Sequence, residues 1–139
     1  MVLSCVTSRK NGDAGLGQAI AWFTSQGWTV SVPLTDSQDY DLVVDSGKLL
    51  KIEVKTTRYK RKPTVRRPNR RYELNLRVSG GNRSGIGKSR LLGNVDFVFA
   101  VTPEAKYLIP AALLLDKPCV GLTATFDKFK LGDVPVGGL

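Results

Sequence analysis

The stretch DLVVDSGKLLKIEVKT, residues 41–56, alternates apolar and charged side chains on both sides of a central glycine. Alternation with a period of two predicts two β-strands, 41–45 and 49–56, each with one apolar and one polar face. Gly47 can take the positive φ that a short connection requires, so residues 46–48 are expected to form the turn. The pattern predicts an antiparallel hairpin with its apolar side buried.

The two faces of this hairpin restrict how its strands can pair. A slip by one residue would move charged side chains onto the apolar face, so only every second register is compatible with burial. A turn centred on Gly47 gives the best of these registers, with Asp45 opposite Leu49. A slip by two residues would keep the same faces and stays open.

The best register places Asp41 directly opposite Glu53, with Lys55 on the same face. Facing carboxylates in a sheet have Cβ atoms roughly 4.5–5.5 Å apart and repel each other. A cation between them would relieve that repulsion, and Mg²⁺ is commonly held by one or two carboxylates with water and phosphate oxygens. Lys55 could then contact a metal-bound water or a phosphate, while Lys51 on the same face is an alternative. An ordinary amphipathic hairpin with a polar outer face has the same spacing.

Composition narrows the possible functions. The 139 residues contain no histidine, which excludes imidazole general bases and histidine-ligated zinc sites. The length favours a single domain over 1–139. No apolar run is long enough to span a membrane. Two distant cysteines without metal-ligand spacing favour a reducing, cytoplasmic location.

The net charge of +9 is concentrated in one segment. Residues 58–90 hold twelve Lys and Arg against one acidic residue, and the rest of the chain has nine basic and eleven acidic residues. Positive charge this concentrated favours binding to a phosphate backbone, although a solvated basic loop is the alternative. Residues 58–71 contain two prolines and are expected to form a loop or arm, and residues 79–90 a Gly-rich loop. The residues expected to contact nucleic acid are Arg58, Lys60, Arg61, Lys62, Arg66, Arg67, Arg70, Arg71, Arg77, Asn82, Arg83 and Lys88.

The remaining segments predict one helix followed mainly by strands. Apolar residues spaced by three and four predict a helix over 13–26, ended by Gly27. Before it, residues 1–11 are expected to be an arm or a first strand. Further strands are expected at 28–33, 72–78, 95–101 and 107–109, with a helical turn at 111–115. This order predicts an α/β or α+β domain around a mixed sheet.

The order of these pieces resembles the PD-(D/E)XK nuclease core. The similarity is carried by YDLVVD at 40–45 and KIEVKT at 51–56, preceded by GLGQA at 15–19 on the helix. Later pieces, around 74–82, 95–99 and 107–110, resemble small intron-associated endonucleases of that superfamily. The resemblance covers residues 12–110.

This resemblance implies a restriction-endonuclease-like sheet flanked by helices and a divalent-metal site. Asp41, Glu53 and the carbonyl of Val54 would hold Mg²⁺, for which Mn²⁺ could substitute. Lys55 would orient or help deprotonate the attacking water and stabilise charge on the phosphate. Members often carry a glutamate on the first helix, and Gln18 stands at that position here, which favours one metal ion over two.

Three functions are compatible with these features. The leading expectation is a Mg²⁺-dependent endonuclease of an intron or mobile element that cuts double-stranded DNA. A Holliday-junction-resolving nuclease acting on branched DNA is the second. A nucleic-acid-binding protein without catalytic activity is the third, and the combination of Asp41, Glu53 and Lys55 argues against it. A 15.2 kDa endonuclease usually needs a homodimer or higher oligomer to cut both strands.

Overall fold

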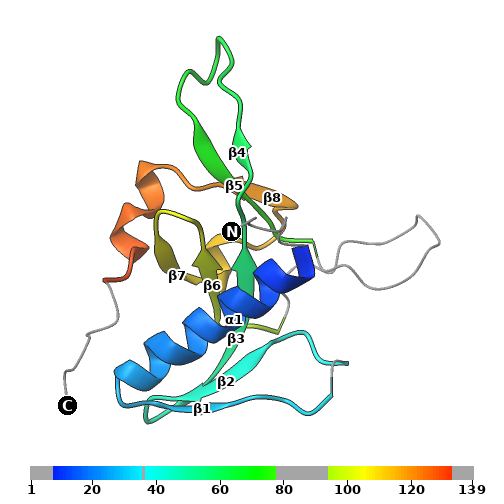
Figure 1. Cartoon of the computed structure of the whole chain (residues 1–139), viewed down its shortest axis with the longest axis vertical. Helices are drawn as coiled ribbons and strands as arrows, with labels where there is room; N and C mark the ends of the chain where they lie inside the picture. The colour runs from blue at the N-terminus through cyan, green and yellow to red at the C-terminus, as the bar shows by residue number, and fades with distance from the viewer. Residues whose placement is uncertain (1–7, 36, 78–93, 133–139) are drawn as a thin grey trace, which may run out of the picture.

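A five-stranded mixed sheet in the order β1-β2-β3-β6-β7 forms the centre of the computed structural model (Figure 1). The structure describes residues 8–35, 37–77 and 94–132. The strands of this sheet are β1 (Thr29–Ser31), β2 (Leu42–Asp45), β3 (Leu49–Thr56), β6 (Phe97–Val101) and β7 (Lys106–Pro110). All neighbouring pairs are antiparallel except β3 and β6, which run parallel. The predicted α+β class with a mixed sheet is confirmed.

A second, smaller sheet has the order β4-β5-β8. Its strands are β4 (Lys60–Arg61), β5 (Arg71–Asn75) and β8 (Cys119–Gly121). The helical elements are α1 (Ser8–Ser25) and two 3₁₀-helices, η1 (Ala111–Leu113) and η2 (Ala124–Phe129). None of the helices in the described parts of the chain is long and apolar enough to cross a membrane.

The helix α1 crosses one face of the large sheet (Figure 1). Its buried residues Ala19, Trp22 and Phe23 pack against the apolar side of β2 and β3 and against Phe99. Close approach is possible because Gly15 is buried against β3, where an added Cβ would lie 2.0 Å from Thr56 Oγ1. The packing of α1 therefore fixes the position of β3 from one side.

The opposite face of the sheet is covered by β5, β8 and the 3₁₀-helices. Val98 and Ala100 of β6 pack there with Leu74 of β5, Val120 of β8 and Phe126 of η2. Strand β6 is thus covered on both sides, as its continuous apolar sequence predicts. On this face, the described residues contribute a small sheet and 3₁₀-helices in place of an α-helix.

The pairing of β2 with β3 follows the best register expected from the sequence. Asp45 lies opposite Leu49 and Leu42 opposite Ile52, so the register slipped by two is excluded. Gly47 has a φ of +97°, and its N–H donates to Asp45 Oδ1 at 2.9 Å. The strand over 49–56 has the predicted bounds.

Other boundaries differ from the predictions. The helix begins at Ser8, so residues 8–11 are helical and not an arm or strand, while 1–7 lie outside the described residues. Gly27, with a φ of +79°, follows the helix as expected. The segment 58–71, expected to be a loop or arm, contains β4, the start of β5 and a Thr64–Arg67 bridge. Strand β8 and helix η2 were not predicted.

Candidate active site

Asp41 stands at the edge of the ladder between β2 and β3. Its N–H donates to the Ile52 carbonyl at 2.9 Å, and its Oδ2 accepts the N–H of Val54 at 2.7 Å. The backbone groups of Ile52 and Val54 point toward β2, because they alternate along an antiparallel ladder. Since β2 begins at Leu42, the Asp41 carboxylate takes the place of a backbone acceptor for Val54. The Asp41 carboxylate and the Val54 carbonyl therefore share one edge of β3.

Glu53 and Lys55 share the face of β3 that is turned away from α1. Lys55 Nζ lies 2.7 Å from Glu53 Oε1, and the two side chains are 18% and 10% exposed. Their parallel neighbours on β6 are Ala100 for Lys55 and Val98 for Glu53. These neighbours are buried, so the ion pair borders the core and not open solvent.

The surroundings of Glu53 disfavour its negative charge. Burial raises the pKa of the Glu53 carboxyl, Lys55 partly offsets this, and the nearby Asp41 carboxylate raises the pKa further. A cation bound between Asp41 and Glu53 would relieve both the repulsion and the cost of burying the charge. The donor chemistry of the two carboxylates and the adjacent Val54 carbonyl fits a hard, oxygen-preferring cation. No group of three or more acidic, Cys or His side chains that could hold a metal occurs in the described residues.

Lys51, the alternative to Lys55, is directed to other partners. Its Nζ donates to Asn94 Oδ1 at 3.0 Å and lies 5.5 Å from the centre of the Tyr40 ring. Its backbone N–H donates to Asp96 Oδ2 at 2.8 Å. These contacts join β3 to the start of β6, so Lys55 is the lysine paired with Glu53.

The structure does not bring Gln18 together with Asp41 and Glu53. Gln18 lines a small cavity of about 70 Å³ on the α1 side of the sheet, with Thr56, Arg58 and Thr102 among its neighbours. Glu53 and Lys55 lie on the opposite face. The structure therefore separates Gln18 from the two carboxylates, and its role as a site residue stays a prediction.

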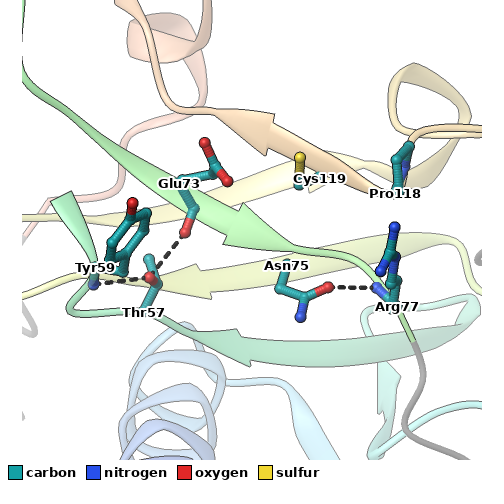
Figure 2. Close-up of a pocket in the computed structure, with 7 residues that line it drawn as sticks. All are labelled: Thr57, Tyr59, Glu73, Asn75, Arg77, Pro118 and Cys119. Carbon is teal, nitrogen blue, oxygen red and sulfur yellow. Dashed lines mark hydrogen bonds between the residues drawn. The ribbon is translucent and has the colours of Figure 1, made fainter. Parts of the chain in front are cut away.

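A cavity of about 460 Å³ opens where β3 ends (Figure 2). It is lined by Thr57, Tyr59, Glu73, Asn75, Arg77, Pro118 and Cys119. Thr57 Oγ1 donates to the Glu73 carbonyl at 2.8 Å, and the Tyr59 N–H donates to Thr57 Oγ1 at 3.1 Å. Thr57 follows Lys55 by two residues, so the cavity opens close to the end of β3 that carries Lys55.

The basic residues predicted to contact DNA fall into three groups. The segment 58–71 supplies most of them, and its residues 61–70 are all exposed. Arg77 is exposed and lines the larger cavity. Asn82, Arg83 and Lys88 lie outside the described residues.

Sequence reasoning missed Glu104, which lies between β6 and β7. Its Oε1 is 3.1 Å from Lys60 Nζ, which anchors the basic segment to the large sheet. The two residues are 44 positions apart, so no local pattern indicates the pair. Exposed ion pairs of this kind are found only once the fold is known.

Comparison with known proteins agrees with this fold. The chain belongs to the PD-(D/E)XK endonuclease family, whose family model matches residues 6–117. Among solved structures, it is similar to the bacterial homing endonuclease I-Ssp6803I, with 26% identity and a TM-score of 0.63. That match covers 95% of this chain and 84% of the other. A search of curated proteins gives no match.

Proposed function

We propose that the protein is a DNA endonuclease that hydrolyses phosphodiester bonds with Mg²⁺, acting from Asp41, Glu53 and Lys55. The observation that carries this proposal is the position of these three side chains, Asp41 directly before β2 and Glu53 and Lys55 on β3. Asp41 reaches Val54 N–H, and Glu53 pairs with Lys55 at 2.7 Å. Membership of the PD-(D/E)XK endonuclease family supports the assignment of this cluster as a nuclease centre.

Each residue of the cluster has a chemical role in this proposal. The carboxylates of Asp41 and Glu53, with the Val54 carbonyl, would hold the metal ion. A bound Mg²⁺ lowers the pKa of water and shields charge that develops on the phosphate, and Mn²⁺ should substitute. Lys55 would leave its ion pair with Glu53 to orient the attacking water or to contact the phosphate. The buried residues Val98 and Ala100 of β6 limit the access of bulk solvent to the Glu53–Lys55 ion pair.

DNA as the substrate is supported by charge. The excess of basic residues lies in 58–90, directly after the strand that carries Glu53 and Lys55. Such a surface favours association with a polyanion and makes affinity strongly dependent on salt. The similarity to a bacterial homing endonuclease supports a role in homing or in mobile DNA. We also propose a homodimer or higher oligomer, because cutting both strands needs two such centres.

Cleavage of supercoiled plasmid in Mg²⁺ and in EDTA tests the proposed activity. We expect nicked and linear products with Mg²⁺ or Mn²⁺, and none in EDTA. Duplex and four-way-junction substrates assayed side by side then separate a homing enzyme from a junction-resolving one. Failure to cut plasmid, duplex and junction DNA with either metal would contradict the nuclease proposal. Light scattering of the purified protein tests the oligomer.

A further inference from the structure

The basic segment after β3 is a hairpin that projects from the body of the protein (Figure 1). At its base, Lys60 pairs with Tyr72 and Arg61 with Arg71. Near its tip, Thr64 and Arg67 exchange two backbone hydrogen bonds of 2.9 Å. Between base and tip, the prolines at 63 and 68 lack the N–H that a continuous ladder needs. We call residues 58–71 the basic hairpin.

Two of the basic side chains at the base of the basic hairpin form ion pairs within the protein. Lys60 pairs with Glu104 at 3.1 Å, and Arg61 pairs with Glu73 at 3.3 Å. Lys60 Nζ also lies 4.9 Å from the centre of the Tyr72 ring. Lys60, and to a smaller extent the Tyr72 hydroxyl, lowers the pKa of the Glu104 carboxyl. These base charges hold the hairpin to the rest of the protein.

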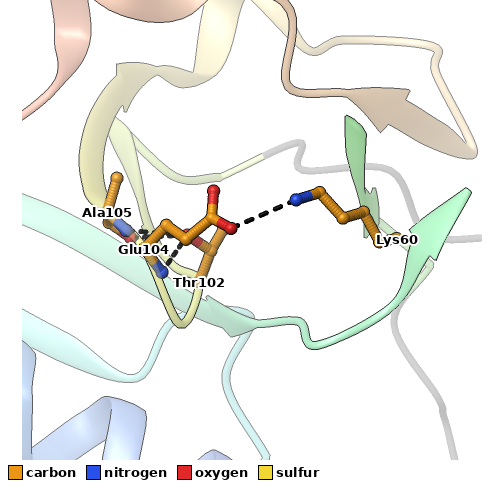
Figure 3. Close-up of polar contacts among 4 residues, drawn as sticks. All are labelled: Lys60, Thr102, Glu104 and Ala105. Carbon is orange, nitrogen blue, oxygen red and sulfur yellow. Dashed lines mark hydrogen bonds and ion pairs between the residues drawn. The ribbon is translucent and has the colours of Figure 1, made fainter. Parts of the chain in front are cut away.

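Glu104 is presented by a tight turn between β6 and β7 (Figure 3). The buried Thr102 accepts the N–H of Ala105 at 2.9 Å and of Glu104 at 3.3 Å on its Oγ1. The same hydroxyl donates to the Ala105 carbonyl at 3.0 Å. A turn fixed in this way gives the Lys60–Glu104 contact a defined position relative to β3 and the candidate active site.

The tip of the basic hairpin differs from its base. Its basic residues Lys62, Arg66, Arg67 and Arg70 are exposed, and none of them forms an ion pair with the part of the chain that the structure describes. Val65, between Thr64 and Arg66, is fully exposed. The unpaired cations around Val65 favour association of the tip with a polyanion.

We propose that the tip of the basic hairpin enters the major groove of duplex DNA beside the phosphate to be cut, while Lys60 and Arg61 serve as anchors. This inference rests on the proposed function and deepens it by dividing the basic residues into two roles. Arg66 and Arg67 contact phosphates that border the groove, and Val65 contacts an apolar base surface such as a thymine methyl group. Glu104 is a positioning residue, because it acts through Lys60.

The shape of the hairpin supports the choice of groove. A two-stranded β-ribbon fits the major groove, which is about 12 Å wide and about 8.5 Å deep. Residues 60 to 65 in extended conformation would reach roughly 16 Å from the body, at about 3.3 Å per residue. The tip can therefore reach the groove floor while β3, from which the hairpin starts, stays close to the backbone of the same duplex.

Two double variants that lose the same charge distinguish the contributions of the tip and of the base to DNA binding. The measurement is binding of a mixed-sequence duplex oligonucleotide in EDTA across a salt series. The tip variant is Arg66→Gln with Arg67→Gln, and the base variant is Lys60→Gln with Arg61→Gln. The tip variant should reduce the salt slope by about 1.8, because each phosphate that a side chain neutralises adds about 0.9 to that slope. The base variant should reduce it by less than half of that amount.

Groove choice is tested in the same assay with competitors. Methyl green, which occupies the major groove, should displace the wild-type protein, and netropsin, which occupies the minor groove, should not. Val65→Ala should leave the salt slope unchanged. Equal slopes for the tip and base variants, or displacement by netropsin alone, would overturn the inference. Tighter binding to single-stranded DNA or RNA than to duplex would overturn it as well.

The outcome is independent of the proposed activity, since no cleavage occurs in EDTA. A protein whose binding depends on the tip but which never cuts DNA would retain this inference and lose the proposed function. If the protein cuts plasmid with Mg²⁺ but both double variants bind DNA alike, the proposed function is retained and this inference is lost.

Discussion

The β2–β3 hairpin and the basic hairpin are neighbours along the chain but are stabilised in different ways. Strand β3 lies between β2 and β6, and its apolar face is covered by α1. The basic hairpin has a short ladder at its base and exposed residues from 61 to 70. In the first hairpin, the Glu53–Lys55 ion pair lies on a largely covered face of β3; in the second, unpaired basic residues are spread over the surface. We therefore expect chemistry at the rigid β2–β3 hairpin and DNA contact at the projecting basic hairpin.

The largest effect should come from removing a charge at the rigid hairpin. Asp41→Asn keeps an oxygen that can accept Val54 N–H, but it removes the negative charge that would hold the metal. Plasmid cleavage should therefore fall by about 10²–10⁴-fold with little change in the melting temperature. A cleavage rate close to that of wild type would exclude Asp41 from the site.

The next largest effect should be the loss of stability when a buried side chain of the β2–β3 hairpin is truncated, compared with an exposed one of the basic hairpin. Ile52 of β3 is completely buried, so Ile52→Ala should reduce the free energy of unfolding by about 2–5 kcal/mol. Val65 at the hairpin tip is fully exposed, so Val65→Ala should change it by no more than about 0.5 kcal/mol. Urea unfolding of both variants checks this, and similar losses would show that the tip packs against the protein.

The contact between α1 and β3 gives a smaller effect with a matched control. In Gly15→Ala, the new Cβ would lie 2.0 Å from Thr56 Oγ1, which should cost about 1–3 kcal/mol of stability. Gly17 has open space around it, so Gly17→Ala should be neutral or stabilising by up to about 1 kcal/mol. Equal effects of the two substitutions in chemical unfolding would show that helix and strand do not touch at Gly15.

Glu53 predicts a pH dependence of the metal-free protein. Its pKa is raised in the folded state by burial, so the folded protein binds this proton more tightly than the unfolded chain. The contribution of Glu53 to the free energy of unfolding is therefore most favourable below the ordinary pKa of 4.5. It is lost as the pH rises through the raised pKa of Glu53 in the folded protein. Relative to Glu53→Gln in EDTA, wild type should lose stability over that window. A difference that is constant with pH would contradict this assignment.

The sequence was sufficient for the rigid hairpin, because alternation and a glycine turn determine its faces and its best register. Asp41 opposite Glu53 follows from that register, and the structure places Lys55 Nζ 2.7 Å from Glu53 on the face that alternation predicts. The separation of Gln18 from these residues depends on how α1 crosses the sheet, which periodicity does not specify.

The sequence was insufficient for the basic hairpin. Two prolines and many charges are typical of a loop, and the contacts that oppose this tendency come from Glu73 and Glu104, 12 and 44 positions from their partners. Strand β8 was missed for a related reason, since three residues ending in glycine give no recognisable alternation.

The central claim is that Lys55, held by Glu53 on β3, acts in metal-dependent cleavage of DNA. Plasmid nicking with Mg²⁺ by wild type, Lys55→Met and Lys51→Met tests it most directly, because Lys51 lies on the same strand but contacts Asn94. Lys55→Met should reduce the rate by about 10²–10⁴-fold with unchanged DNA affinity, and Lys51→Met should stay close to wild type. Equal activity of Lys55→Met and wild type, or a loss confined to Lys51→Met, would contradict the account.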